Sequence, residues 1–413
     1  MDYLRFFLSN KKLISFGFFL TFFSSFGQTF LVSLYVPSIM SEFGLTNGEF
    51  GILYGAATVF SGFCLVYGGR FIDSCNLRTY TLSAVILLMA SCFVVSASSH
   101  LVWVFLGFWG LRFGGQGLLS HISNTSISKF FSKRRGTALS LSVMGYSVGE
   151  ACLPFVIGCT IALIGWRYSM FLNGILMGLT LVPFVFVALS DKRHRIPDQQ
   201  QSRPGSKVDS VISLWKDKRF IIIVASMFIL PFMTTGFLFH QLRLADEKGW
   251  AVELLTASFL GFALGRSLFS LVSGKLIDKY SALRVFPYYL SPFLAGLLIL
   301  ALFDSPLAAP VYLALTGITM GMSSTTTTAL LAEVYGTQSL GRIRAMSVTV
   351  IVFGTALSPA IFGVLLDAGI SFRLITAGSA CLIACSMLAN SRLKYYFESA
   401  AHKSSAKKIC CEV

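Results

Sequence analysis

Three charged residues stand inside long apolar stretches of this 413-residue sequence: Arg112, Glu150 and Arg266. Each stretch holds about 20 residues or more, which is the helical length needed to cross a hydrocarbon core of about 30 Å. A charge at mid-depth of a bilayer costs at least about 3 kcal/mol, so it is rarely kept without a partner or a task. Their positions within the stretches place all three near mid-depth.

The three charges can be paired in more than one way. Arg112 and Glu150 occupy successive antiparallel stretches, so we expect Arg112 to be the partner of Glu150. Arg266 has no obvious carboxylate at its depth, because Asp278 follows twelve residues later in a loop. Such an arginine is suited to an anionic solute, since its planar guanidinium matches a carboxylate. Two structural alternatives stay open: a purely structural pair of Arg112 with Glu150, and a role for Arg266 in binding backbone carbonyls.

Polar residues near these charges complete a candidate site. Gln116 lies one helical turn from Arg112, and Gln28 is a polar spot in the first apolar stretch. We expect Arg112, Arg266, Gln116 and Gln28 to bind a small-molecule substrate and Glu150 to carry a proton. An anion on the arginine would favour protonation of Glu150, because it neutralises the positive charge that stabilises the carboxylate. The hypothesis is symport of a proton with an organic (carboxylate) anion.

The composition agrees with a chain that crosses a membrane many times. Residues of the AVILMFWYC set make up 55% of the sequence and charged residues 12%, whereas a soluble domain is about a quarter charged. Twelve apolar stretches are long enough to span a bilayer. They lie near 13–37, 50–69, 79–98, 101–127, 136–164, 167–190, 219–242, 252–274, 285–303, 308–332, 345–366 and 371–391.

Lysine and arginine predict the direction of these spans. With the N-terminus in the cytosol, twenty-seven of the 33 Lys and Arg residues fall on the cytosolic side and four on the far side. The positive-inside rule therefore predicts that both termini are cytosolic. Their position in short gaps between spans argues against a nucleic-acid partner. The short loops and tails suit a bacterial inner (plasma) membrane.

The sequence repeats itself at an offset of 205 residues. The segment Gly69–Asp73 recurs as Gly274–Asp278, and Gly149–Pro154 recurs as Gly354–Pro359. Two matches at one offset predict two parallel halves related by an axis along the membrane normal. The expected organisation is an N-terminal six-helix half at 1–190, a cytosolic linker at 191–218, a C-terminal six-helix half at 219–392 and a cytosolic tail at 393–413.

Twelve spans, a central loop, parallel halves and a G-x-L-x-D box after spans two and eight resemble the major facilitator superfamily. The resemblance covers nearly the whole chain and implies an all-α integral membrane fold. In that fold, spans three, six, nine and twelve face lipid more and the other eight line a central cavity, so all three buried charges are on lining spans. The stretches Arg112–Gly117 and His240–Trp250 are similar to transporters of the monocarboxylate and oxalate–formate type.

The resemblance also implies a charge latch at the cytosolic ends of spans two and eight. In this interpretation each box aspartate engages basic groups or a helix terminus, and each box glycine lets a neighbouring backbone approach. The residues are Gly69, Arg70, Asp73, Arg78, Gly274, Asp278 and Arg284. Phe71 and Asn76-Leu77 depart from the family pattern in the first box. The alternative is that both boxes only mark topology and keep loops solvated.

The function that we expect is secondary active transport by alternating access within the lipid bilayer, with a proton or another coupling ion. A drug or metabolite exporter of the same fold is the nearest alternative. A membrane-embedded enzyme finds no support, because H-E-x-x-H, G-x-S-x-G and clusters with metal-ligand spacing are absent from the sequence. Without G-x-x-x-x-G-K-[ST], direct use of ATP is not expected. We expect no metal and no cofactor. A non-transporting sensor stays open.

Overall fold

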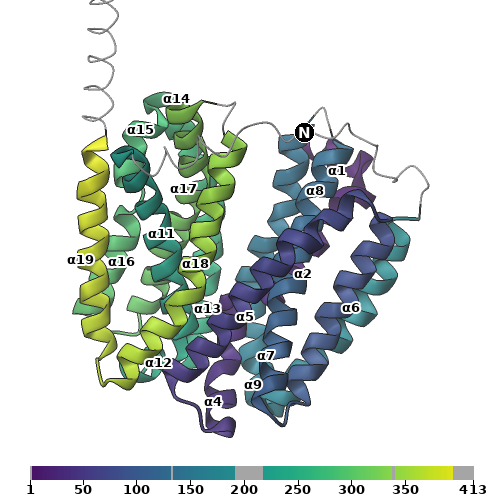
Figure 1. Cartoon of the computed structure of the whole chain (residues 1–413), viewed down its shortest axis with the longest axis horizontal. Helices are drawn as coiled ribbons and strands as arrows, with labels where there is room; N and C mark the ends of the chain where they lie inside the picture. The colour runs from purple at the N-terminus through teal and green to yellow at the C-terminus, as the bar shows by residue number, and fades with distance from the viewer. Residues whose placement is uncertain (1, 132–133, 191–216, 337–339, 394–413) are drawn as a thin grey trace, which may run out of the picture.

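The computed structural model describes residues 2–131, 134–190, 217–336 and 340–393 (Figure 1). Within these ranges every regular element is a helix, which confirms the all-α prediction. The helices form two bundles side by side, α1–α9 and α11–α19. The predicted linker 191–218 and tail 393–413 lie almost wholly outside the described residues.

The first bundle contains one element of unusual geometry, the π-helix η4. Its helices are α1 (Asp2–Ser9), α2 (Lys11–Ser24), η1 (Ser25–Gly27), α3 (Thr29–Val32), η2 (Ser33–Tyr35), α4 (Val36–Phe43), α5 (Asn47–Gly68), η3 (Gly69–Asp73), α6 (Leu77–Ser96), α7 (Leu101–Gly110), η4 (Leu111–Leu119), α8 (Ser120–Phe130) and α9 (Arg135–Ala188). Two local breaks matter for the site: α9 turns back at Gly165, whose φ is +78°, and the first span is interrupted at Gln28.

The second bundle repeats the pattern with a continuous first long helix. Its helices are α11 (Lys218–Phe239), α12 (Gln241–Lys248), α13 (Val252–Ala257), α14 (Phe259–Tyr280), α15 (Ala282–Val285), η6 (Phe286–Tyr288), α16 (Ser291–Leu302), α17 (Ala308–Tyr335), α18 (Leu340–Asp367) and α19 (Phe372–Ser391). Pro231 inside α11 and Pro359 inside α18 are tolerated, as in other membrane helices.

Eight helices of the described residues are long and apolar enough to cross a membrane, or nine when the bent pair Lys11–Gly27 and Thr29–Phe43 is taken as one span. One of the eight is α9, which passes twice because of the turn at Gly165. The segments Leu101–Phe130 and Ala308–Tyr335 also run between the two ends of the molecule (Figure 1). The arrangement is consistent with the twelve predicted passes.

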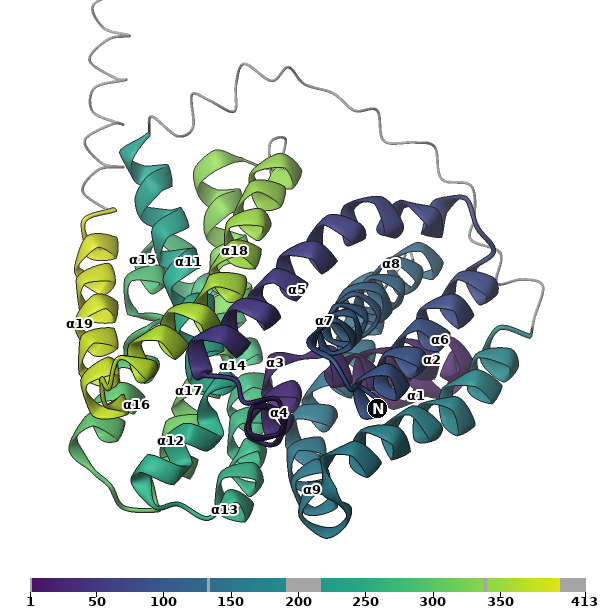
Figure 2. The ribbon, with the colours of Figure 1, turned by 60° about the horizontal axis from the view of Figure 1, so that its bottom comes forward.

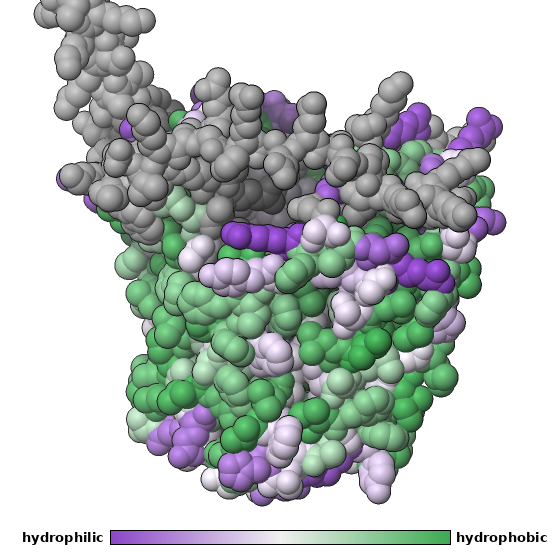
Figure 3. All heavy atoms as spheres, turned by 45° about the vertical axis from the view of Figure 1, so that its right-hand side comes forward, coloured by the Kyte–Doolittle hydropathy of each residue, from purple (hydrophilic) through white to green (hydrophobic). Residues whose placement is uncertain are grey.

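The outer surface between the two ends is apolar. Figure 3 shows a hydrophobic band with hydrophilic residues gathered above and below it. Large apolar side chains that are exposed on the described helices include Phe60, Leu163 and Leu271, the last two with 82% and 70% of their surface exposed. Such a surface is favourable in contact with lipid chains and unfavourable in contact with water. We call the end that carries the N-terminus, Arg70 and Arg284 the basic face, and the end with Gly44 and Gly165 the opposite face.

Packing within each bundle repeats at the offset seen in the sequence. A Cβ added at Gly149 would collide with Ser25 of the first span, and one at Gly354 would meet Phe228 of α11 at 3.0 Å. On the opposite face, Glu42 accepts hydrogen bonds from Arg167 at the start of the returning helix. Glu247 lies 205 residues after Glu42, and it accepts from the backbone N–H of Phe372, 205 residues after Arg167.

The two bundles join on the opposite face and at mid-depth. Figure 2 brings this face forward and shows α4 and the start of α5 lying between the bundles. Glycines allow α5 and α18 to touch through their backbones, since a Cβ at Gly51 or Gly55 would collide with the carbonyl oxygen of Pro359 or Ala356. A second seam brings α9 against α14, and Ser267 donates to Ser147 across it at 2.8 Å.

The glycine of the second box does not behave as we expected. A Cβ placed at Gly274, near the basic end of α14, would meet no atom within 4 Å among the described residues. The prediction that a neighbouring backbone approaches Gly274 is therefore wrong for this conformation. The physical reason is that the bundles are held together at their other end, where the glycines of α5 make that kind of contact.

Candidate functional site

An ion pair between the two bundles occupies the middle of the molecule. Arg266 on α14 donates from Nη1 to Oε1 of Glu150 on α9. The Glu150 side chain is 2% exposed and that of Arg266 is 33% exposed, so the guanidinium is the accessible member. Two sequence predictions are thereby corrected: Glu150 pairs with Arg266 and not with Arg112, and Arg266 does have a carboxylate at its depth.

The immediate surroundings of the pair are polar on the accessible side. The guanidinium of Arg266 lies over the ring of Tyr146, with 5.4 Å between its carbon and the ring centroid. The Ser267–Ser147 hydrogen bond runs beside it. Oε2 of Glu150 is buried and has no hydrogen-bond partner in the part of the chain that the structure describes. A buried carboxylate with one unsatisfied oxygen is costly, so protonation of this group is chemically accessible.

Arg112 donates hydrogen bonds to the chain at the interruption of the first span. It lies in the π-helix η4, is 3% exposed, and donates from Nη1 to the carbonyl of Gly27 at 3.3 Å and to Oγ1 of Thr29 at 3.4 Å. Its guanidinium also lies over the ring of Tyr54 at 5.2 Å. The carbonyl-binding role that we held open for Arg266 is thus the one that Arg112 performs.

Gln28 and Gln116 lie on either side of this interruption. Gln28 has an extended backbone, with φ −89° and ψ 149°, and its Nε2 has no partner among the described residues. The backbone N–H of Gln116 lies close to Gly27, where a Cβ would meet it at 2.5 Å. Glycine at position 27 therefore lets the broken span fit against the π-helix. A role of either glutamine in binding a substrate stays a prediction.

Replacing Arg112 with alanine is expected to lower the free energy of unfolding by about 2–4 kcal/mol, because charged hydrogen bonds to a buried carbonyl are lost and a cavity remains. The measurement is the melting temperature in detergent, which should fall by several degrees, while Arg5→Ala, at an exposed arginine, should leave it unchanged. An unchanged melting temperature with lost ligand binding would instead assign Arg112 to the solute.

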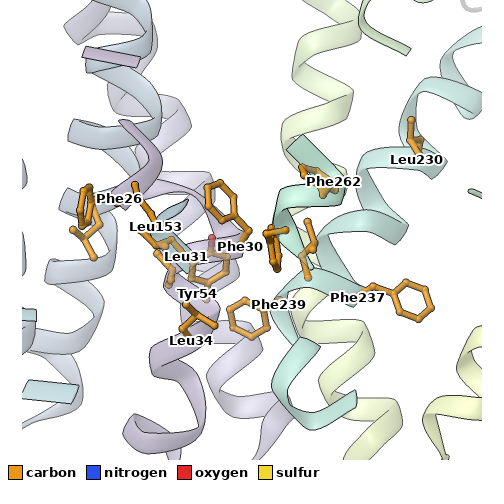
Figure 4. Close-up of a cluster of buried hydrophobic side chains, with 14 of the residues drawn as sticks. Phe26, Phe30, Leu31, Leu34, Tyr54, Leu153, Leu230, Phe237, Phe239 and Phe262 are labelled. Atoms are coloured by element: carbon orange, nitrogen blue, oxygen red, sulfur yellow. The ribbon is translucent and has the colours of Figure 1, made fainter. Parts of the chain in front are cut away.

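A contact that the sequence did not reveal joins the two bundles toward the opposite face. Phe239, the last residue of α11, packs against the Tyr54 ring across the bundles, with 4.7 Å between the ring centroids (Figure 4). Its ring also lies 6.0 Å from that of Phe50. The next-but-one residue, Gln241, donates from Nε2 to the carbonyl of Phe30 at 3.0 Å and to Oγ of Ser33 at 2.8 Å.

The structure describes only some of the residues of the predicted latch on the basic face. Arg70 lies beside the Tyr67 ring and Arg78 lies over the Phe186 ring at 4.1 Å. Asp278 and Arg284 are exposed, and no ion pair joins them to the first bundle within the described ranges. The side chain of Asp73 lies outside the described residues. Gating by these residues stays a prediction.

Two hollows lie at the opposite face. The larger, about 670 Å³, lies between the end of the first span and α12, with Met40, Asn47, His240 and Arg243 among its lining residues. The smaller measures about 230 Å³. Among the described residues, no group of three His, Cys, Asp or Glu side chains is placed to hold a metal ion.

Comparison with known proteins gives a consistent family. The model of the Major Facilitator Superfamily matches residues 17–260 and 236–408. A probable hexose phosphate transport protein of Chlamydia muridarum (strain MoPn / Nigg) is 27% identical over 151 residues, which are 36% of this chain and 33% of that protein. The match thus spans about a third of that relative's length. The MFS-type transporter pytF of Aspergillus terreus is 26% identical over 226 residues, 52% of this chain and 73% of that protein.

Solved structures agree on the fold. A point mutant of the nucleoside transporter NupG superposes with a TM-score of 0.74 at 15% identity, over 92% of this chain and 98% of that chain. A bacterial homolog of the human lysosomal transporter Spinster, in an inward-facing and unoccupied conformation, gives 0.65 at 13% identity over 95% of both chains. At these identities the likeness concerns the fold alone.

Proposed function

The chain belongs to the major facilitator superfamily, and from this premise we propose that it carries a small organic anion across a membrane together with a proton. Its family and its apolar helices make it an integral membrane transporter of small solutes. The observation that carries the finer proposal is the Glu150–Arg266 pair, which bridges the two bundles at mid-depth. The two halves that move would be residues 1–190 and 219–392.

The pair supports coupling through a competition for Arg266. While Glu150 is ionised, it neutralises the guanidinium and ties α9 to α14. A proton on Glu150 removes that negative charge and leaves Arg266 free to bind an anion, which suits its planar donors. Loaded with one proton and one monovalent anion, the site carries no more net charge than when the pair is intact. The cross-bundle ion pair is then absent, so the halves are free to rearrange.

An anionic head group agrees with the relatives. The chlamydial relative is named for hexose phosphate, a phosphate ester, and guanidinium binds phosphate and carboxylate by the same paired hydrogen bonds. The Arg266–Glu150 site has one accessible arginine, because Arg112 is buried against the carbonyl of Gly27. This single accessible cation favours a monovalent carboxylate over a doubly charged phosphate ester.

The orientation follows from the basic residues. We propose that the basic face and both termini lie in the cytosol of a bacterial cell, with the chain in the inner membrane. The contacts of Phe239 and Gln241 between the bundles then close the site toward the outside. In this orientation the described conformation is one that binds or releases solute on the cytosolic side.

The test is thermal unfolding of the purified protein with a panel of solutes. A ligand at 100 times its Kd stabilises the folded state by about 2.7 kcal/mol. We expect monocarboxylates to raise the melting temperature of the wild type and to leave that of Arg266→Ala unchanged. Stabilisation by lipophilic cations alone would contradict the proposal and favour the drug-exporter alternative. Stabilisation by nucleosides or neutral sugars alone would equally overturn the anion assignment.

A further inference from the structure

The carboxylate of Asp367 reaches across the seam between the bundles and binds the first turn of α5. Asp367 is the last residue of α18. Its Oδ1 accepts from the backbone N–H of Asn47 at 3.0 Å and from Nδ2 of Asn47 at 2.9 Å, and its Oδ2 accepts from the backbone N–H of Gly48 at 2.7 Å. A helix N-terminus attracts negative charge, so this contact combines hydrogen bonds with an interaction with the helix dipole.

These are the two N–H groups that the helix's own cap leaves unsatisfied. Oγ1 of Thr46 accepts from the N–H of Glu49, and the Glu49 carboxylate accepts from the N–H of Thr46, which is a complete capping box. The N–H groups of Asn47 and Gly48 have no acceptor inside that box. Asp367 of the other bundle supplies it. While the opposite face is closed, a carboxylate of the other bundle, and not water, therefore satisfies these two N–H groups.

The seam is shaped for this contact. A Cβ at Gly48 would meet Oδ2 of Asp367 at 3.0 Å, and a Cβ at Gly363 would collide with the carbonyl oxygen of Asn47. A larger side chain at either glycine would hold α18 away from α5. Residues 48 and 363 thus give the carboxylate close access to the helix terminus.

The related seam on the other side of the molecule has no such contact. The residue 205 positions before Asp367 is Ala162, at the end of the first pass of α9, and the residue 205 positions after Asn47 is Val252, the first of α13. Both line the hollow of about 230 Å³, with Glu253 exposed at its rim. The carboxylate acts at one seam only, that of α5 and α18.

We propose that Asp367 is a positioning residue for transport, which holds the opposite face closed by capping α5 from the other bundle and must release it whenever that face opens. The proposal rests on alternating access between two halves, as the proposed function does, but on neither the anion nor the proton. Glu247 provides a matched comparison: its carboxylate caps α19 through the N–H of Phe372 on the same face, within one bundle.

The experiment measures distances between spin labels in the solute-free protein. Labels at Ser99 and Ser305, both exposed and in different bundles, report the opposite face, and labels at Thr79 and Lys279 report the basic face. The nine native cysteines are first replaced by serine. Asp367→Asn is expected to raise the ratio of open to closed opposite face about tenfold, the effect of losing a cap and a charge at a helix terminus. Glu247→Gln should leave the ratio unchanged.

A second variant tests the contact from α5. Asn47→Pro removes the backbone and side-chain donors of that residue, and proline is well accepted at the first position of a helix whose own capping box is intact. It should shift the ratio in the same direction even if Asp367→Asn fails to fold. Wild-type distances in both variants, or an equal shift in Glu247→Gln, would overturn the proposal. Because no solute is present, a failed anion hypothesis leaves this result unaffected.

Discussion

Replacing Arg266 with alanine is expected to weaken binding of the transported anion by roughly 10- to 100-fold, because a hydrogen bond between charged groups contributes about 1.5–3 kcal/mol. Arg112 cannot take over, since it is 3% exposed and bound to the Gly27 carbonyl. The measurement is solute uptake into proteoliposomes at a concentration well below saturation, together with the dissociation constant in detergent. Both should change by the same factor.

Two further variants separate charge from geometry. Arg266→Lys keeps the positive charge and loses the planar pair of donors, so we expect a smaller loss than in the alanine variant. Arg243→Ala removes an arginine that pairs with Asp246 at the surface of the opposite face, and it should transport as the wild type does. A folded Arg266→Ala protein that binds the anion with wild-type affinity would make the Glu150–Arg266 pair a purely structural contact.

The fold was predictable because its signals are local and repeated. Each span is visible as a run of apolar residues, and the parallel halves are visible because Gly69 and Gly274, or Gly149 and Gly354, recur at one offset. The packing reflects the same offset, since Gly149 and Gly354 each contact the first long segment of their bundle. A repeated contact needs only a repeated residue, which sequence alone can show.

The partners of the buried charges were not predictable because they depend on how each helix is rotated. Adjacent antiparallel spans suggested that Arg112 faces Glu150, yet α9 presents Glu150 to α14 of the other bundle. The π-helix η4, which holds Arg112, also has a wider turn than the regular helix that the sequence led us to expect. No periodicity in the sequence announces either the π-helix or the interruption at Gln28.

The contact of Asp367 with α5 shows a second limit of sequence reasoning. Asp367 precedes Gly369, whose φ is +78°, and this reads as an ordinary helix end followed by a turn. Its function as a cap depends on α5, which lies some 320 residues earlier in the chain. The box aspartates gave a stronger sequence signal, but in this conformation Asp278 is exposed and the closed seam is held from the other end.

Replacing Glu150 with glutamine is expected to abolish the pH dependence of anion binding. Glutamine has nearly the shape of a protonated glutamate and cannot ionise, so Arg266 stays free of a competing carboxylate at every pH. In the wild type the anion binds together with a proton, so its affinity should be highest at low pH and should fall about tenfold per pH unit once Glu150 ionises. The measurement is the dissociation constant of the stabilising monocarboxylate from about pH 5 to about pH 9, in detergent.

In Glu150→Gln we expect anion exchange and gradient-driven accumulation of the anion to respond differently. Exchange of labelled for unlabelled anion needs no net movement of protons, and Glu150→Gln should retain it; accumulation driven by a pH gradient needs the titrating carboxylate and should be lost. Glu42→Gln is the matched control, because Glu42 pairs with Arg167 inside one bundle and should leave both activities and the pH profile as in the wild type. Gradient-driven accumulation by Glu150→Gln with a wild-type pH profile would move proton coupling to another group and leave Arg266 with the anion alone.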